Sequence, residues 1–327
     1  MNKTKKSIVT IGGGTGHYSL LSGLKHVKDC IITAIVSMAD NGKSTGELRD
    51  QLGALPPGDI LKALVALSQL PEETTRDILM TRFTVGSAFS GHNAGNLMLT
   101  LFHQYSGNFI DTINATGEIL KIRGRVLPVT TANINLHAEL EDGQIIHGET
   151  NIDIPKHNPD LHVKRVYLEP NGMALGSVIS AIRDADHIII SPGDLWTSII
   201  PVLLVNGVTT AIAQSRAQIT IITNLMTKRG ETNGYGVNEF VYGIETHMKK
   251  PCDNILFNSQ HPTAETIKSY EEEGGHIVHR ENLSEILRSK RRFIEKDLLE
   301  EKDGLVRHHR NKLRVAISEI IHNNVSP

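Results

Sequence analysis

A glycine-rich turn near the N-terminus is the part of the sequence most suited to binding a ligand. Residues 7–11 are mostly β-branched and apolar, and apolar residues at helical spacing begin at Leu20, so we predict a strand, a tight turn and a helix. Backbone N–H groups in such a turn, together with the helix N-terminus, bind phosphate. The predicted phosphate contacts are Gly12, Gly13, Gly14, Thr15 and Gly16.

Two standard nucleotide-binding patterns do not fit this region. The dinucleotide pattern G-x-G-x-x-G requires glycine where His17 stands, which makes NAD a less favoured ligand. Residues 42–45 have the Gly-Lys-Ser end of a P-loop, but Ser37 stands at the position of its first glycine. We therefore do not expect a Walker-type ATPase. The alternative for the glycine turn is a tight turn that binds nothing.

The elements that must position this turn follow from an alternation of strands and helices. Apolar strands are predicted at residues 31–36, 187–191, 218–223 and 254–258, and helical patterns follow the last three directly. Such alternation is typical of a parallel sheet covered on both faces. We predict an α/β fold, a three-layer α/β/α arrangement with a mostly parallel, Rossmann-like sheet.

Two regions depart from this alternation. Residues 125–170 contain short strands with Asp142-Gly143 as a hairpin turn, so we predict a small antiparallel β-rich insert packed on an edge of the main sheet. From residue 281 onward the sequence is rich in charged residues, and its pattern predicts helix. The predicted domains are residues 1–280, which bind the nucleotide and include the insert, and residues 281–327, a charged helical extension packed on or beside them.

In open α/β sheets, ligands bind beyond the carboxyl ends of the strands. Four polar loops are predicted at such ends, namely residues 12–17, 40–45, 192–198 and 224–235, and we expect them to converge on one crevice. The further predicted nucleotide or phosphate contacts are Asn41, Lys43, Ser44, Asn93, Asn96, Pro192, Gly193, Asp194, Thr197, Ser198, Asn224 and Thr227.

Three residues are candidates for catalysis. Asp40 follows the second strand, where it could contact a ribose, bind Mg²⁺ as the candidate metal ligand, or cap the next helix. Asp59 follows Pro-Pro-Gly and is predicted as a helix N-cap, with a possible second role facing the crevice. His92 lies in the polar run 91–96 and could act as a general acid or base.

Arg123 and Arg125 flank Gly124 and are candidate substrate anchors, because a guanidinium group holds carboxylate or phosphate with paired hydrogen bonds. The alternative for both is a surface ion pair. Trp196, the only tryptophan, could stack on a ring of the ligand, although aromatic residues more often serve packing.

Composition limits the classes of partner. The net charge of −2 gives no global attraction to nucleic acid, and no stretch approaches the roughly 20 apolar residues of a membrane span, so we expect neither nucleic-acid binding nor membrane insertion. Cys30 and Cys252 are too few for a disulfide framework and suit a reducing compartment. With no export signal evident at the N-terminus, the sequence predicts a cytoplasmic protein.

Taken together and in order, several motifs between residues 7 and 258 resemble those of the bacterial gluconeogenesis factor family, a relative of 2-phospho-L-lactate transferase. These motifs are residues 9–16, 39–42, 55–60, 91–96, 123–128, 192–195 with 197–201, and 224–227 with 230–232. The resemblance implies a three-layer α/β/α fold, a homo-oligomer and a nucleotide-type ligand. In the gluconeogenesis factor branch this ligand is expected to be a nucleotide sugar such as a UDP-sugar, and the protein supports cell shape and envelope synthesis during growth on gluconeogenic carbon sources.

In the transferase branch, the resemblance implies transfer of a phospholactyl group from a guanosine diphosphate carrier to a deazaflavin, with Mg²⁺. The glycine turn and residues 192–198 would then meet the nucleotide, and Asp40 the metal or the ribose. The family commonly has two acids where this chain has Asp40-Asn41, and Gly and Ser in the stretch occupied here by Lys43, Ser44 and Thr45. Loss of one carboxylate favours binding without turnover. Three hypotheses stay open: a nucleotide-sugar-binding regulator, a Mg²⁺-dependent transferase and an NAD-dependent oxidoreductase.

Overall fold

The structure is a computed structural model that describes residues 5–41, 55–84, 89–280 and 291–322. The predicted contacts Lys43 and Ser44 lie outside these residues. A seven-stranded sheet in the order β10-β9-β8-β7-β1-β2-β3 forms the centre of the described structure, and its neighbouring strands are parallel. Its strands are β1 (Lys6–Gly12), β2 (Cys30–Val36), β3 (Arg125–Pro128), β7 (His187–Ile190), β8 (Gln218–Ile222), β9 (Asn254–Asn258) and β10 (Arg292–Lys296).

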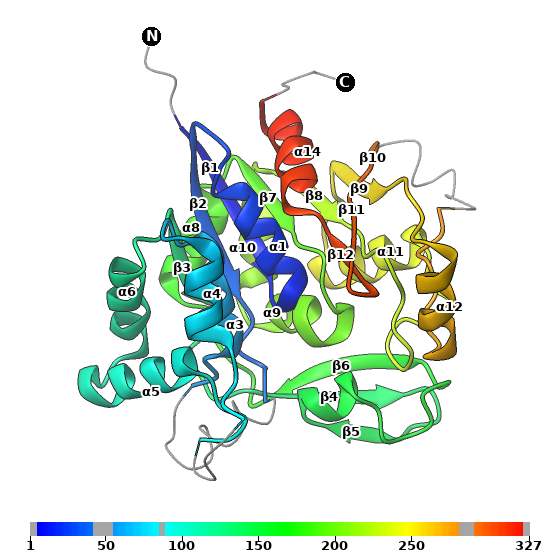
Figure 1. Ribbon diagram of the computed structural model, residues 1–327, viewed down its shortest axis with the longest axis horizontal. Helices are drawn as coiled ribbons and strands as arrows, with labels where there is room; N and C mark the ends of the chain where they lie inside the picture. The colour runs from blue at the N-terminus through cyan, green and yellow to red at the C-terminus, as the bar shows by residue number, and fades with distance from the viewer. Residues whose placement is uncertain (1–4, 42–54, 85–88, 281–290, 323–327) are drawn as a thin grey trace.

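Helices cover both faces of this sheet (Figure 1). On the near face, α1 (Gly14–Leu24) packs against α3 (Gly58–Leu67) and α14 (Arg310–His322). On the far face lie α8 (Gly176–Arg183), α9 (Ile200–Leu204), α10 (Val208–Gln214) and α11 (Val237–Met248). The predicted three-layer α/β/α fold with a Rossmann-like sheet is confirmed.

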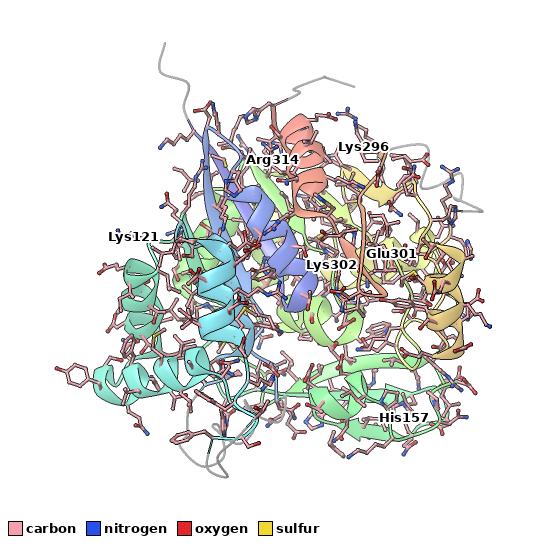
Figure 2. All side chains as sticks on the ribbon, viewed as in Figure 1. Lys121, His157, Lys296, Glu301, Lys302 and Arg314 are labelled. Atoms are coloured by element: carbon pink, nitrogen blue, oxygen red, sulfur yellow. The ribbon has the colours of Figure 1, made fainter. Side chains whose placement is uncertain are left out.

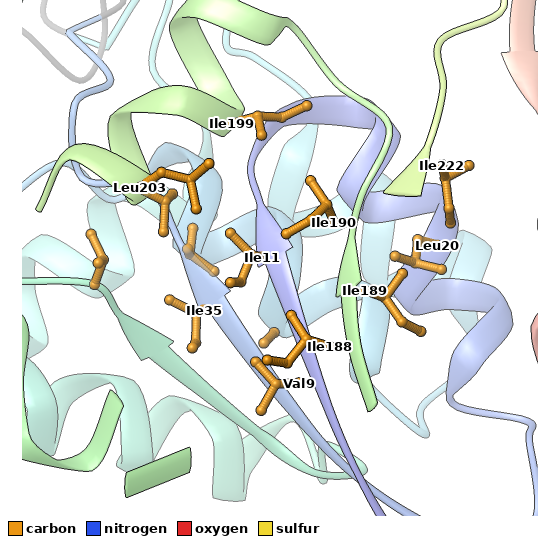
Figure 3. Close-up of a cluster of buried hydrophobic side chains, with 14 of the residues drawn as sticks. Val9, Ile11, Leu20, Ile35, Ile188, Ile189, Ile190, Ile199, Leu203 and Ile222 are labelled. Carbon is orange, nitrogen blue, oxygen red and sulfur yellow. The ribbon is translucent and has the colours of Figure 1, made fainter. Parts of the chain in front are cut away.

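The sheet is buried because its strands are apolar on both sides. Val9 and Ile11 of β1 are fully buried, as are Ile35 of β2 and Ile188 of β7. Figure 3 shows these side chains packed together, with Leu203 of α9 among them. Such continuous apolar runs are typical of central parallel strands. The core therefore fixes the carboxyl ends of β1 and β7 next to each other.

The remaining helices lie at the sides of the sheet. Next to α3 lie α4 (Glu72–Met80), α5 (Ala94–Ser106) and α6 (Phe109–Ile119), and α12 (Ala264–Glu272) follows β9 in the chain. Among the described residues, no helix combines the length and apolar character that crossing a membrane requires.

The β-rich insert forms a separate three-stranded antiparallel sheet in the order β5-β4-β6. It consists of β4 (Asn135–Leu140), β5 (Ile145–His147) and β6 (Val163–Glu169), with α7 (Glu149–Asp153) between β5 and β6. The hairpin predicted at Asp142-Gly143 is confirmed. The predicted start of the insert at residue 125 was wrong, because residues 125–128 pair with β2 as edge strand β3 of the main sheet.

The position of the insert also differs from the prediction. It does not pair with an edge of the main sheet; β6 packs on α9, below the carboxyl ends of the strands in Figure 1. Asn41, which follows β2, holds it there: the Asn41 Oδ1 accepts hydrogen bonds from Thr150 N at 2.8 Å and Thr150 Oγ1 at 3.0 Å. These contacts, rather than an edge strand, locate the insert.

The C-terminal region is only partly helical, contrary to the prediction for residues 281–327. Residues 292–296 form β10, an edge strand of the main sheet. The strands β11 (Leu299–Lys302) and β12 (Leu305–His308) then form an antiparallel hairpin before α14 begins at Arg310. The high charge that suggested a solvated helix also suits an edge strand and an exposed hairpin, because charges on exposed edges prevent unwanted pairing.

Candidate functional site

The glycine turn lies at the point where the strand order of the sheet reverses. Chain neighbours β1 and β2 lie side by side, whereas β1 pairs on its other side with β7. The loops that follow β1 and β7 therefore leave the sheet next to each other. Such a switch point is where ligands bind in open α/β sheets.

Close packing between these loops accounts for three of the glycines. A Cβ atom at Gly16 would lie 2.2 Å from the Pro192 carbonyl oxygen, and one at Gly12 would lie 1.9 Å from Ser191 Oγ. A Cβ atom at Gly13 would lie 2.4 Å from Asp59 Oδ2. In the direction in which a side chain would project, these three positions are filled by protein atoms. The glycine turn is therefore in large part a packing device, which the sequence alone did not reveal.

Gly14 is different, because its surroundings are open. Its φ of +67° favours glycine, and the nearest atom to a Cβ atom there would be Ser198 Oγ at 3.5 Å. Gly14, Thr15 and Gly16 form the first turn of α1, which has neither a side-chain cap nor an acidic residue there. The first N–H groups of a helix have no partner within the helix, so these amides can donate to an anion.

A cavity of about 330 Å³ opens directly on this helix N-terminus. Three of the four predicted polar loops meet there; of the fourth loop, residues 40–45, the structure describes only Asp40 and Asn41, which do not line the cavity. The predicted contacts that line the cavity are Gly14, Thr15, Gly16, Pro192, Gly193, Asp194, Asn224 and Thr227.

Sequence reasoning missed other residues in the lining, among them Lys228, Tyr270, Arg307 and His308. Lys228 falls within the predicted loop 224–235, and its positive charge could have identified it as a candidate contact for an anion. Tyr270 comes from α12, and Arg307 and His308 come from β12, which was predicted as helix. No local pattern signals that these segments return to the glycine turn.

The loop after β7 enters a five-residue π-helix, η1 (Leu195–Ile199). Thr197 and Ser198 are buried within it, and the Thr197 hydroxyl lies 3.4 Å from a carboxylate oxygen of Glu231. Trp196 is also buried, and its Nε1 donates a hydrogen bond to the Glu231 carbonyl oxygen at 2.9 Å. This contact gives Trp196 the packing role that was the alternative to stacking on a ligand.

Three carboxylates gather around one ammonium group beside the cavity. Lys228 Nζ forms a hydrogen bond with Asp153 and lies 3.0 Å from Glu231 Oε1 and 3.6 Å from Asp194 Oδ2. Burial, reinforced by the charge of Asp194, raises the pKa of Glu231 to about 8. Carboxylate oxygens are ligands that Mg²⁺ prefers, and one from each of these acids lies within 4.8 Å of the others. Lys228 already supplies the positive charge there, so this trio does not fit a further cation without displacing the lysine.

Asp40, the predicted metal or ribose ligand, belongs to a neighbouring acidic group. Burial and the charges of Asp40, Asp153 and Asp59 raise the pKa of Glu149 to about 8. Lys62 Nζ lies 2.9 Å from Asp59 Oδ1, and this charge raises the pKa of Lys62. The charges of Asp40 and Asp59 thus act on the same two groups, Glu149 and Lys62, and neither aspartate lines the cavity.

Asp59 does not cap its helix as predicted. Pro57 is the N-cap residue of α3, and Asp59 lies in the first helical turn, where its carboxylate faces Gly13. A carboxylate in the first turn favours the helix through its charge instead of through a capping hydrogen bond.

His92, Asn93 and Asn96 do not line the cavity. Asn93 is the N-cap of α5, and its side chain accepts a hydrogen bond from Asn96 N at 2.8 Å. The capping alternative thus accounts for Asn93. Asn41 is engaged by Thr150, as described above.

Arg123 and Arg125 lie at the opposite end of the sheet. Arg123 donates hydrogen bonds to the carbonyl oxygens of Lys25 and Val27, which precede β2, and Arg125 Nε donates to Thr33 Oγ1 at 2.9 Å. Both arginines stand at the amino end of β3. Neither arginine lines the cavity, so the structure gives no support to their prediction as substrate anchors. Residue type indicated an anion contact, whereas strand direction decides which end of the sheet they occupy.

Comparisons with known proteins agree with this architecture. The family model for 2-phospho-L-lactate transferase CofD matches residues 8–299. Proteins named gluconeogenesis factor from Listeria innocua and Bacillus subtilis are 38% and 37% identical, covering 98% and 97% of this chain and 97% and 98% of their own lengths. A crystal structure of a Bacillus halodurans protein, 38% identical, superposes with a TM-score of 0.89 over 96% of this chain and 99% of that one. The chain therefore belongs to the CofD family, together with these relatives named gluconeogenesis factor.

Proposed function

We propose that this chain is a cytoplasmic, nucleotide-sugar-binding gluconeogenesis factor that supports cell shape and envelope synthesis during growth on gluconeogenic carbon sources. The observation that carries the proposal is the cavity at the switch point of the sheet, where the uncapped N-terminus of α1 faces a lining that includes Asn224, Lys228 and Arg307. The names of its relatives support the gluconeogenic role. We also propose a homo-oligomer, as the family resemblance implies.

The lining suits the parts of a nucleotide diphosphate. The amides of Gly14, Thr15 and Gly16 would receive phosphate oxygens, and the exposed guanidinium of Arg307 would contribute charge-assisted hydrogen bonds. Tyr270 supplies an aromatic ring, and its hydroxyl accepts a hydrogen bond from Val306 N at 3.0 Å, which links the ring to β12. An aromatic ring at a binding site offers a face for a base or sugar.

The proposal favours binding without turnover. Lys228 compensates the acids Asp153, Asp194 and Glu231, so the carboxylates closest to the cavity are already paired. Lys228 offsets part of the negative charge of these acids and so lowers their repulsion of a nearby diphosphate. Binding then reports the ligand's concentration to the rest of the protein.

Calorimetry with UDP-sugars, GDP and NAD, with and without Mg²⁺, tests the proposal. We expect a UDP-sugar to bind without being consumed, and Arg307→Gln to weaken it about tenfold, as loss of a charge-assisted hydrogen bond implies. Arg216→Gln, an exposed arginine outside the cavity, is the matched control and should bind normally. If none of these ligands binds the wild type, the proposal fails.

A Mg²⁺-dependent transferase is the second candidate, favoured by the group Asp40, Asp59 and Glu149. Their carboxylate oxygens suit Mg²⁺, and the charges of Asp40 and Asp59 act on the Glu149 carboxyl group. When bound, Mg²⁺ would neutralise phosphate charge during transfer of a phosphorus-containing group. Appearance of a Mg²⁺-dependent product in the same experiment, lost in Asp40→Asn, would establish this candidate in place of a binding protein.

A further inference from the structure

A second cavity, of about 420 Å³, lies on the other side of α1 from the β7 loop. It is lined by α1, α3, α4, the β11–β12 hairpin and the start of α14, and shares Thr15, Ser19, Arg307 and His308 with the cavity proposed for the nucleotide. Figure 2 shows Lys302 on β11, where the hairpin approaches α1. The two cavities are thus neighbours with a common wall.

Positive charge predominates in the lining of this second cavity. Five cationic side chains and three carboxylates line it. The cations are Lys62, Arg76, Lys302, Arg307 and Arg310, and the acids are Glu72, Glu300 and Asp303.

Internal pairing accounts for only some of these cations. Glu72 accepts hydrogen bonds from Arg310 and from Tyr18, and also lies 3.7 Å from Lys25 Nζ. Lys62 is paired with Asp59. Among the described residues, Arg76 and Lys302 have no ion pair, and Arg307 donates only to the Val306 carbonyl oxygen. Three cations from three different elements therefore face one cavity without acidic partners.

We propose that this cavity binds a small phosphorylated molecule, separate from the nucleotide-type ligand. Guanidinium groups from α4 and β12 can hold a phosphate with paired hydrogen bonds, and the Lys302 ammonium adds a point charge. The hydroxyls of Thr15 and Ser19 extend the polar wall toward the first cavity. A volume of about 420 Å³ leaves room beside a phosphate group, so we expect the ligand to be a phosphorylated metabolite and not a bare ion.

The common wall makes the two ligands interdependent. Arg307 lines both cavities. A phosphate bound to Arg307 in one cavity therefore changes the attraction of Arg307 for a phosphate in the other cavity. Any such coupling is reciprocal, because each ligand must change the other's affinity by the same factor. The β11–β12 hairpin, which carries Lys302 and Arg307, is therefore the element that connects the two sites.

Calorimetry with glycerol 3-phosphate as the probe, and glycerol as its uncharged counterpart, tests this inference at constant ionic strength. We expect millimolar or tighter binding of glycerol 3-phosphate and none of glycerol. Arg76→Gln and Lys302→Gln should each weaken the probe about tenfold, since each removes a cation that touches only this cavity. The exposed control variants Arg216→Gln and Lys268→Gln should bind the probe normally.

Binding that is unchanged in both Arg76→Gln and Lys302→Gln, or absent in the wild type, overturns the inference. Displacement of the probe by a UDP-sugar, together with weaker UDP-sugar binding in Arg76→Gln, also overturns it, because the cavity would then be an extension of the nucleotide site. The probe measurement needs no nucleotide. A wild type that binds glycerol 3-phosphate but no nucleotide sugar would therefore refute the proposed function alone.

Discussion

Asn224, which follows β8, exchanges two hydrogen bonds with the backbone of Gly193 in the loop after β7. Its Oδ1 accepts from Gly193 N at 3.0 Å, and its Nδ2 donates to the Gly193 carbonyl oxygen at 2.9 Å. Both residues line the cavity at the switch point. The amide side chain therefore fixes one wall of the site relative to the next strand.

Replacing Asn224 with Asp should damage the site with almost no change in shape. A carboxylate can still accept from Gly193 N but cannot donate, and it places negative charge against the Gly193 carbonyl oxygen. We expect UDP-sugar affinity, measured by calorimetry, to fall about tenfold, as the loss of one hydrogen bond and the added repulsion imply. Asn158→Asp adds the same charge on an exposed loop outside the cavity and should leave affinity unchanged. Equal affinities in both variants would contradict the role given to Asn224.

The glycines of the turn should divide into two classes. Gly16→Ala places a methyl group against the rigid Pro192 carbonyl, so its melting temperature should fall by several degrees, as a loss of about 1–3 kcal/mol implies. The methyl group of Gly14→Ala would lie in open space, so the only cost is the backbone strain of an alanine at positive φ, about 1 kcal/mol. Combined with Thr15→Val, Gly14→Ala should abolish nucleotide binding while the fold survives. Thermal unfolding ranks the two alanine variants, and a Gly14→Ala protein less stable than Gly16→Ala would refute the division.

Local sequence patterns were sufficient to predict five of the seven strands of the sheet and half of the residues that line the first cavity. A strand that ends in glycines before a helix carries its physical meaning within about ten residues, so the loops after β1, β7 and β8 could be placed at one edge of the sheet. Arg307 and Tyr270 could not be placed there from the sequence, because their positions depend on how segments distant in the chain fold back onto that edge of the sheet. The close approach of Gly16 to Pro192 is likewise a tertiary contact that no local pattern shows.

Arg123 illustrates the same limit, and its role can be tested. Its guanidinium donates to the carbonyl oxygens of Lys25 and Val27, so Arg123→Met should lower the free energy of unfolding by about 2 kcal/mol, as two charge-assisted hydrogen bonds imply. UDP-sugar affinity should not change. Urea unfolding and calorimetry measure the two effects, with the exposed Arg125→Met as the comparison, for which we expect a smaller loss. Intact stability with lost binding would restore Arg123 as a substrate anchor.

Glu231 gives the stability of the protein a specific pH dependence. Burial and Asp194 raise its pKa in the folded state to about 8, against an ordinary value of 4.5, although Lys228 opposes the shift. Between these values the folded protein holds a proton that the unfolded chain has released. The resulting contribution to stability is complete below pH 4.5 and is lost as the pH rises toward 8, with a slope of up to about 1.4 kcal/mol per pH unit.

Glu231→Gln removes this titration, because the amide stays neutral at every pH. We expect the unfolding free energy of the wild type, measured by urea unfolding from pH 5 to pH 8, to decrease steadily relative to that of the variant as the pH rises. Glu149 also has a raised pKa, but both proteins retain it, so its contribution to the pH dependence cancels in the difference between their unfolding free energies. Glu265→Gln, at an exposed position on α12, should show no such trend. A flat difference for Glu231→Gln would mean that Lys228 keeps the Glu231 carboxylate ionised, and that the cluster has enough positive charge without a proton.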